Sequence, residues 1–374
     1  MRAMIGRVVS STLCLLLFGN GVAQAACIGS AIHAAPDPEP NWFSAVYASS
    51  PDDAWAVGER VSRSRIFRGL TEHWDGQRWN RVDSASFAFG LNSVSGISAD
   101  DVWAVGSGVS RCGNGQAFAQ HWDGNRWTAM SPDICASVET NFSSVAEVTT
   151  SDLWAVGSDS EEGAGGTEIT HDFVVRHTGR KWTSYGMPDD PYQGGLAAVA
   201  AVSADDVWAV GNFIVDRTGS YNLIFHWNGT TWSDVRVNNP QRIGFLSALG
   251  VVSSNDVWAV GGQAGSLGGT SQPLIEHWDG SVWSVIPHGA GANGAVLTSV
   301  SAVASNDVWA AGFDPSGTHI EHWDGRTWSV LRAQTMPGMF AGLAVVPGMN
   351  AVWAVGSDPG PFLNSIATSA VFHC

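Results

Sequence analysis

Apolar and polar residues alternate with a period of two over short stretches of the chain, and turn-forming residues separate these stretches. In residues 297–303 apolar and small side chains alternate, and the polar segment 305–307 follows. Three further short apolar segments come next, at 308–312, 319–323 and 327–331. A period of two predicts β-strands, and no period near 3.6 residues competes with it. The sequence therefore predicts four short strands in this part of the chain.

The same pattern occurs seven times. Each copy carries a phrase related to Asp-Asp-Val-Trp-Ala-Val-Gly, and the first six carry a second phrase related to Glu-His-Trp-Asp-Gly-x-x-Trp, whose Asp-Gly predicts a tight type I′ hairpin. The tryptophans of the first phrase are Trp55, Trp103, Trp154, Trp208, Trp258, Trp309 and Trp353. Four antiparallel strands in a repeat of 44 to 54 residues predict an all-β, seven-bladed β-propeller. We expect its blades at about 43–83, 90–130, 142–185, 195–237, 245–287, 296–332 and 340–374 plus 27–34.

The chain ends are expected to close the ring. The seventh repeat stops before its fourth strand, whereas segment 27–34 has no partner in its own repeat. This segment is therefore predicted to supply the missing outer strand, which places Cys27 beside Cys374. A second disulfide between Cys112 and Cys135 is expected because both lie in loops of one face. Four cysteines permit three pairings, and a free or lipidated Cys27 is the alternative.

Residues 1–25 have the features of a signal peptide. Arg2 and Arg7 form a basic start, residues 8–18 are apolar, and Ala-Gln-Ala marks a cleavage site. The expected mature chain is one propeller, residues 26–374, secreted, periplasmic or on the cell surface. An uncleaved anchor and a lipoprotein are the alternatives.

Composition narrows the classes of partner. The chain is 44% hydrophobic, 14% charged and carries a formal charge of −16. This acidity argues against a nucleic-acid partner, which requires clustered Lys and Arg. No internal apolar run is long enough to span a membrane, and we expect a monomer.

Tryptophan and histidine occur mainly at repeat positions. Eighteen of the 19 tryptophans belong to the two phrases. We expect them to pack blade against blade, with stacking of sugar rings as the alternative. The sequence predicts a histidine at one shared position of every blade: His73, His121, His177, His226, His277, His322 and His373. Such residues lie around a wide ring and cannot share one metal ion, so a hydrogen bond to the turn aspartate of the same blade is expected for the first six. The seventh repeat has Ala351 at the aspartate position, so His373 needs another partner.

The repeats resemble those of secreted bacterial propellers of the Asp-box, kelch-like and tectonin-like kinds. Asp-Gly-x-x-Trp is similar to a shortened Asp-box, with Gly directly after Asp and His in place of the usual Ser or Thr. This resemblance implies a propeller, and it includes sialidases, other glycosidases and binding proteins, so it implies no single reaction. The Arg-Ile-Pro motif of sialidases is absent from the sequence.

Candidate ligand-binding residues lie in the loops that vary between repeats. Loops between second and third strands, and those joining blades, should emerge on one face, and variable loops on a rigid scaffold often carry function. The candidates are Arg63, Arg65, Arg68, Asp159, Asp216, Asp314 and His319. The arginines suit an anionic group. Acidic residues of the third repeat suit calcium, although no recognised calcium motif is present and no other cofactor is expected.

The function expected from these features is binding. We expect an exported propeller that recognises carbohydrate or an extracellular protein through one face. A glycoside hydrolase or polysaccharide lyase, using carboxylates of different blades, is one alternative. A structural surface protein without a small ligand is the other. No catalytic residue is assigned.

Overall fold

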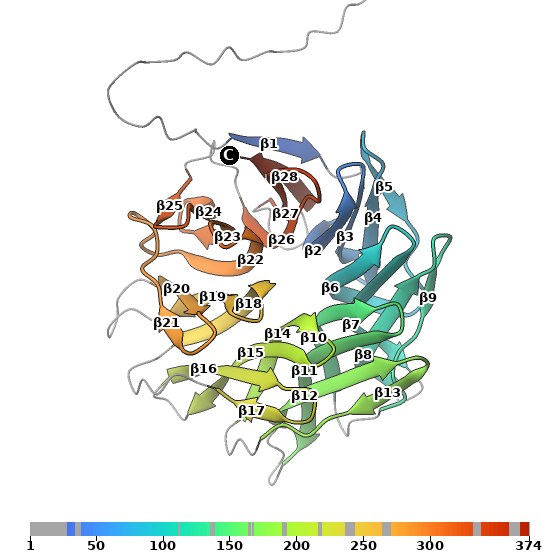
Figure 1. Ribbon diagram of the computed structural model, residues 1–374. Helices are drawn as coiled ribbons and strands as arrows, with labels where there is room; N and C mark the ends of the chain where they lie inside the picture. The colour runs from blue at the N-terminus through green and yellow to red at the C-terminus, as the bar shows by residue number, and fades with distance from the viewer. Residues whose placement is uncertain are drawn as a thin grey trace, which may run out of the picture.

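The computed structural model describes residues 28–33, 39–110, 113–134, 139–163, 166, 168–188, 193–215, 219–235, 244–263, 271–331, 338–358 and 367–373. Over these residues the chain forms 28 β-strands, which make seven four-stranded antiparallel sheets arranged as a ring (Figure 1). The fold is therefore the expected all-β, seven-bladed propeller. In the described part of the chain, no helix has the length and apolar character needed to cross a membrane.

Six blades use four consecutive strands each. Blades 1 to 3 consist of β2 (Asn41–Ser50), β3 (Asp53–Val61), β4 (Phe67–Trp74), β5 (Trp79–Val82); β6 (Ala88–Ser98), β7 (Asp101–Ser110), β8 (Gly113–Trp122), β9 (Trp127–Ala129); and β10 (Glu139–Thr149), β11 (Asp152–Glu162), β12 (Glu168–Thr178), β13 (Lys181–Ser184). Blades 4 to 6 consist of β14 (Gln193–Ser203), β15 (Asp206–Val215), β16 (Gly219–Trp227), β17 (Trp232–Asp234); β18 (Gly244–Ser253), β19 (Asp256–Gln263), β20 (Gln272–Trp278), β21 (Trp283–Val285); and β22 (Val296–Ala304), β23 (Asp307–Asp314), β24 (Gly317–Trp323), β25 (Trp328–Val330). Each blade starts at the centre of the ring and ends at its rim (Figure 1).

Blade 7 closes the ring with both ends of the chain. It consists of β26 (Met339–Val345), β27 (Ala351–Ser357), β28 (Ala367–His373) and, as its outer strand, β1 (Ile28–His33). The register runs from Ile28 opposite His373 to His33 opposite Thr368. The predicted closure by the N-terminal strand is therefore confirmed.

Several predictions from the sequence concern residues outside the described ranges. These are the signal peptide 1–25 and the four cysteines of the two expected disulfides, Cys27, Cys374, Cys112 and Cys135.

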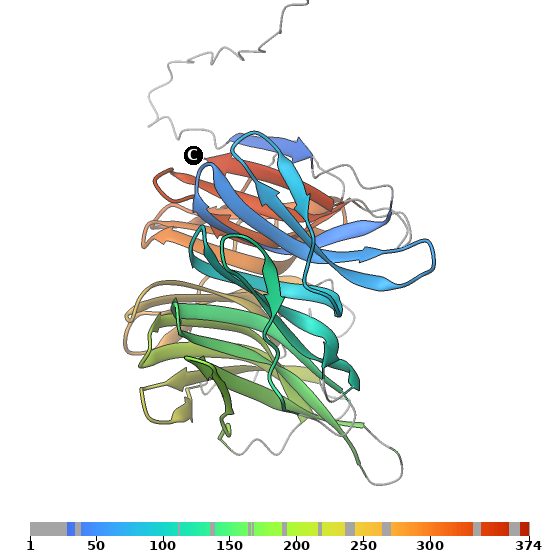
Figure 2. The ribbon, with the colours of Figure 1, turned by 90° about the vertical axis from the view of Figure 1, so that its right-hand side faces the viewer.

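The antiparallel blades divide the ring into two faces. The turns between first and second strands, and between third and fourth strands, lie on one side, which we call the turn face. The loops between second and third strands, and the connections between blades, lie on the other, which we call the loop face (Figure 2).

The glycine of the repeated Trp-Ala-Val-Gly is required by a close backbone approach. In blade 5, a Cβ on Gly261 would lie 1.9 Å from the carbonyl oxygen of Phe245 in the neighbouring inner strand. The other six blades show the same approach, at 1.9 to 2.1 Å. Next to it, the inner strand has a β-bulge between Leu246 and Ala248, which the other inner strands share. Any side chain at this glycine would force the two strands apart.

The hairpin between third and fourth strands is wider than expected. In blade 1, Trp74 pairs with Trp79, so the loop has four residues rather than the two of a type I′ turn. The side chain of Asp75 accepts backbone hydrogen bonds from Gln77 and Arg78, at 3.0 and 2.9 Å. The aspartate therefore replaces part of the backbone turn. Only blade 3 has a two-residue loop among these hairpins, because Thr178 pairs with Lys181.

Tryptophans join each blade to the next, as expected. Trp55 of blade 1 is 1% exposed and contacts Trp122 and Trp127 of blade 2, with ring centroids 4.6 and 5.0 Å apart. Equivalent groups of three tryptophans occur at four other interfaces. At the interface from blade 2 to blade 3, His177 replaces one of the three tryptophans and contacts Trp103. At the interface from blade 6 to blade 7, Phe372 replaces a tryptophan and contacts Trp309. The packing role of the repeated tryptophans is therefore confirmed.

The assignment of one shared histidine position to all seven blades is wrong in two blades. Five histidines do lie opposite the Trp-Ala-Val-Gly tryptophan and bond the turn aspartate: His73, His121, His226, His277 and His322. In blade 3, however, Arg176 lies opposite Trp154, and in blade 7 Val371 lies opposite Trp353. The segment 176–182 has the same length as 73–79 of blade 1, so Arg176 stands at the position of His73 and His177 at that of Trp74.

Candidate functional site

Charged and apolar side chains gather on the loop face where blade 1 meets blade 2. We call this group the blade 1–2 patch, and it consists of Arg63, Arg65, Ile66, Phe67, Arg68, Phe87 and Phe89. The first five come from the loop between β3 and β4 and the start of β4, and the other two flank the start of β6. Ile66, Phe67 and Phe87 are 49%, 40% and 66% exposed, which is unusual for large apolar side chains.

The backbone of the patch is held in a strained conformation at two points. Arg65 has φ of 59° and Phe87 has φ of 82°, and they are the only non-glycine residues with positive φ in the described ranges. Ser62 fixes the first, since its carbonyl accepts a hydrogen bond from Arg65 N at 2.8 Å. The carbonyl oxygen of Phe87 accepts a hydrogen bond of 2.9 Å from the backbone N of Val109, which lies in β7 of the same blade. Both strained residues present their side chains to solvent in the same patch.

A pocket of about 380 Å³ lies within the patch. Its walls are Arg65, Ile66, Phe67 and Phe89, with Glu59 and Ser107 completing the lining. Burial raises the pKa of Glu59 to about 7. The pocket is therefore mainly apolar and has one carboxyl group that changes charge near neutral pH.

The three predicted arginines Arg63, Arg65 and Arg68 all lie on the surface of this patch. Among the described residues, none of them forms an ion pair with an aspartate or glutamate. The nearby Arg60 does, since its Nη1 lies 2.8 Å from Glu39 Oε2. In a chain with net charge −16, this is a local positive surface.

Sequence reasoning identified the arginines but missed the apolar half of the patch. Ile66 and Phe67 stand between the arginines in the sequence, and Phe87 and Phe89 stand in the next connection. Apolar residues within loops of a propeller, where polar ones are usual, were the signal that was available.

The other predicted site residues belong to different blades. Asp159 lies on β11 of blade 3, opposite His171, and burial raises its pKa while the nearby His171 acts against this. Asp216 lies outside the described residues. Asp314 and His319 lie together in blade 6. The structure therefore brings together two groups of candidates, the arginines of blade 1 and the pair of blade 6.

His319 is the centre of a buried polar chain. Its side chain is 1% exposed, and its Nδ1 lies 3.3 Å from Asp314 Oδ2 and its Nε2 3.0 Å from Glu321 Oε1. Glu321 Oε2 also accepts a hydrogen bond from Gly289 N at 2.6 Å, in the connection from blade 5. Despite partial burial, hydrogen bonds from Ser316 and then from His319 lower the pKa of Asp314. This chain holds the connection between blades 5 and 6, with His319 itself away from solvent.

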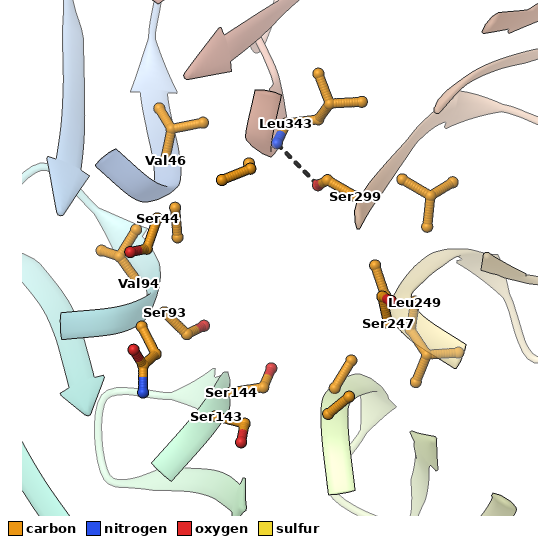
Figure 3. A pocket seen from close by; sticks show the side chains of 18 of the residues that line it. Ser44, Val46, Ser93, Val94, Ser143, Ser144, Ser247, Leu249, Ser299 and Leu343 are labelled. Carbon is orange, nitrogen blue, oxygen red and sulfur yellow. Dashed lines mark hydrogen bonds between the residues drawn. The ribbon is translucent and has the colours of Figure 1, made fainter. Parts of the chain in front are cut away.

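The central channel of the ring is lined by small side chains. A cavity of about 210 Å³ is surrounded by the bulged parts of all seven inner strands. Figure 3 shows the hydroxyl groups of Ser44, Ser93 and Ser247 around it, and the bond from Leu343 N to Ser299 Oγ, at 2.9 Å. Similar bonds from the next blade reach Ser93 and Ser144. The hydroxyls of Ser93, Ser144 and Ser299 therefore join neighbouring blades.

A second group of shifted pKa values lies near the turn face of blades 1 to 3. Burial and then the Asp101 carboxylate raise the pKa of Glu147 to about 9. Burial and then Glu147 raise the pKa of Tyr47 to about 12. Asp101 also accepts a bond from His121 Nε2 at 2.7 Å. Among the described residues, both carboxyl oxygens of Glu147 are buried without a hydrogen-bond partner, which favours the protonated form of this side chain.

Over the described ranges, no three His, Cys, Asp or Glu side chains are placed to share a metal ion. The acidic segment of blade 3 is included only in part, since residues 164, 165 and 167 lie outside these ranges.

Comparisons with known proteins show the fold. No family model matches the chain, and no curated protein sequence does. Among solved structures, YCF48 bound to D1 peptide is similar, with a TM-score of 0.59 and 15% identity over 94% of this chain and 96% of that one. The WD40 repeats of RRP9 give a TM-score of 0.60 and 10% identity over 92% and 97%.

A polysaccharide lyase also shares the fold. The PL25 ulvan lyase bound to -[GlcA(1-4)Rha3S]- gives a TM-score of 0.54 and 9% identity over 88% of this chain and 93% of that one. Identities this low establish a shared propeller architecture, and propellers serve peptide binding, protein assembly and catalysis.

Proposed function

We propose that this chain is an exported binding propeller that docks an extracellular partner through the blade 1–2 patch. The features of a signal peptide in residues 1–25 support export. The seven similar blades provide a rigid scaffold, and the patch lies on the face whose loops vary between blades.

The backbone strain at Arg65 and Phe87 is the observation that carries this proposal. A non-glycine residue with positive φ costs about 1–2 kcal/mol, and glycine would avoid most of this cost. Both strained residues hold an exposed side chain in one patch, one cationic and one aromatic. Strain of this kind is common at binding sites, where it fixes side chains before the partner arrives.

Similar solved structures support a binding role. YCF48 was solved with a bound D1 peptide, and the similar folds include the WD40 propellers of RRP9 and Pan2. The buried positions of the repeated tryptophans also favour this loop surface over a ring of exposed aromatic platforms, because those side chains are used between blades.

The test is a binding screen of the mature chain against arrays of peptides and glycans. The variant Arg63→Ala/Arg65→Ala/Arg68→Ala should lose binding about tenfold or more. The matched control is Arg78→Ala/Arg126→Ala/Arg326→Ala, which removes the same charge from exposed positions of the turn face. Equal binding by both variants, or no probe bound by the wild type, would overturn the proposal.

A further inference from the structure

We propose that the partner of the blade 1–2 patch is a protein segment with one large apolar side chain flanked by carboxylates. The apolar side chain enters the pocket, and the carboxylates contact Arg63, Arg65 and Arg68. This inference rests on the proposed function and adds the chemistry of the partner.

The pocket wall indicates an apolar occupant. Ile66, Phe67 and Phe89 form most of it, and Phe87, two residues before Phe89 in the sequence, is 66% exposed. A volume of about 380 Å³ lies within the range of small ligand pockets and accepts one large side chain. A sugar ring would need many hydrogen bonds, and the polar groups of this lining are limited to Glu59, Arg65 and Ser107.

The charge of the rim indicates carboxylates beside that apolar group. Arg65 lines the pocket, and Arg63 and Arg68 are exposed in the same loop and at the start of β4. Within the described part of the chain, none of the three forms an ion pair with an acidic side chain. Guanidinium groups bind carboxylates in two-pronged geometry, and a positive patch on an acidic protein selects an oppositely charged partner. Acidic residues on both sides of the inserted side chain would therefore pair with the arginines of the patch.

Glu59 makes this recognition depend on pH. Burial raises its pKa to about 7, so its carboxyl is partly ionised at neutral pH. It is covered by Phe89 and Gly90 of β6 and Ser107 of β7, which carry no charge, and Arg65 is the one charged group that shares its pocket. Protonation removes a negative charge from the pocket floor. Affinity for an acidic segment should therefore rise as the pH falls from 8 to 6.

The test uses labelled peptides of about ten residues, measured by fluorescence anisotropy on the mature chain. The array places Phe, Leu or Trp at the centre, between glutamates. Matched peptides replace the glutamates by glutamine, or the central residue by serine. A sulfated oligosaccharide serves as an anion without an apolar side chain.

Acidic peptides with a central apolar residue should bind, and either replacement should weaken binding about tenfold. Arg65→Ala and Phe67→Ser should each weaken it, while Arg126→Ala should not. Glu59→Gln should bind more tightly than the wild type at pH 8 and lose most of the pH dependence.

The outcomes separate the two proposals. Suppose that the oligosaccharide binds, that its binding requires Arg63, Arg65 and Arg68, and that no peptide binds. The proposal of a protein segment as the partner is then wrong, and the proposal that the patch is the docking face stands. If peptides bind equally well to wild type and to the triple arginine variant, both proposals are wrong. The same holds if no probe binds the wild type.

Discussion

Arg176 binds Asp152 with two hydrogen bonds, 2.7 Å from Nε and 2.6 Å from Nη2, at the position where five other blades carry a histidine. The guanidinium also lies 5.0 Å from the centre of the Trp154 ring. Blade 3 therefore keeps the brace of its neighbours with a different side chain. A planar, permanently charged group suits a bidentate contact better than imidazole does.

Loss of this brace should destabilise the protein. We expect Arg176→Ala to lower the free energy of unfolding by about 2 kcal/mol, because Asp152 would keep a largely buried charge without its partner. Arg176→His restores the side chain of the other blades and should cost less. Urea unfolding followed by tryptophan fluorescence gives both values. Equal stability of Arg176→Ala and the wild type would contradict the brace.

His177 should make the stability of the protein sensitive to acid. It is 2% exposed, its Nδ1 has no hydrogen-bond partner among the described residues, and burial lowers its pKa below the ordinary value of 6.5. The unfolded chain therefore binds a proton below about pH 6.5 while the folded chain does not, so acid favours unfolding until the folded pKa is reached.

His177→Phe should remove this contribution and raise the melting temperature more at pH 5 than at pH 8. Phenylalanine fits because Phe372 occupies the same register position in blade 7. The control is His171→Phe, at a half-exposed histidine of the same blade, which should change the pH dependence little. A shift of equal size at both pH values would show that His177 does not titrate in this way.

The glycines of Trp-Ala-Val-Gly should tolerate no side chain. Gly261→Ala places a Cβ 1.9 Å from a backbone oxygen, so we expect a loss of at least about 3 kcal/mol or a failure to fold. Gly186→Ala is the control, since no atom of the described residues lies within 4 Å of its Cβ. Soluble yield and thermal unfolding measure both. A Gly261→Ala protein as stable as the control would mean that the strands separate at little cost.

Relief of the strained backbone should stabilise the protein at the expense of binding. Arg65→Gly and Phe87→Gly should each add about 0.5–1 kcal/mol, after allowance for the greater entropy of glycine in the unfolded chain. Arg65→Ala removes the same side chain but keeps the strain, so it should be less stable than Arg65→Gly. Thermal unfolding of the two variants separates backbone strain from side-chain loss, and the reverse order would argue against strain.

The ring closure should be covalently locked. Ile28 pairs with His373, and these residues adjoin Cys27 and Cys374 in the sequence. We predict a Cys27–Cys374 disulfide, which for a loop of this length contributes about 5–6 kcal/mol if it acts through the entropy of the unfolded chain. Peptide mapping by mass spectrometry without reduction should find it, together with Cys112–Cys135. A lipid on Cys27, or both thiols free in protein exported to an oxidising compartment, would contradict it.

Much of the architecture follows from the sequence because it depends on local pattern. Period-two stretches and the repeated phrases determine the strands, their number per blade and the seven copies. The missing last strand and the unpartnered segment 27–34 determine the closure. The recurrence of Trp55 and its equivalents indicates packing, since one position in every blade meets the same neighbour.

Only the tertiary structure decided features that depend on register or on contacts between blades. In blade 3 the strand register places Arg176 opposite Trp154 and against Asp152, and places His177 at a position that carries tryptophan in blade 1. Matching the histidines of the repeats in the sequence missed this register. His319 resembles a loop histidine in the sequence, yet the connection from blade 5 covers it. The blade 1–2 patch combines the loop between β3 and β4 with the connection before β6. These two segments belong to different blades, and the strand pattern within one blade does not show how it packs against the next.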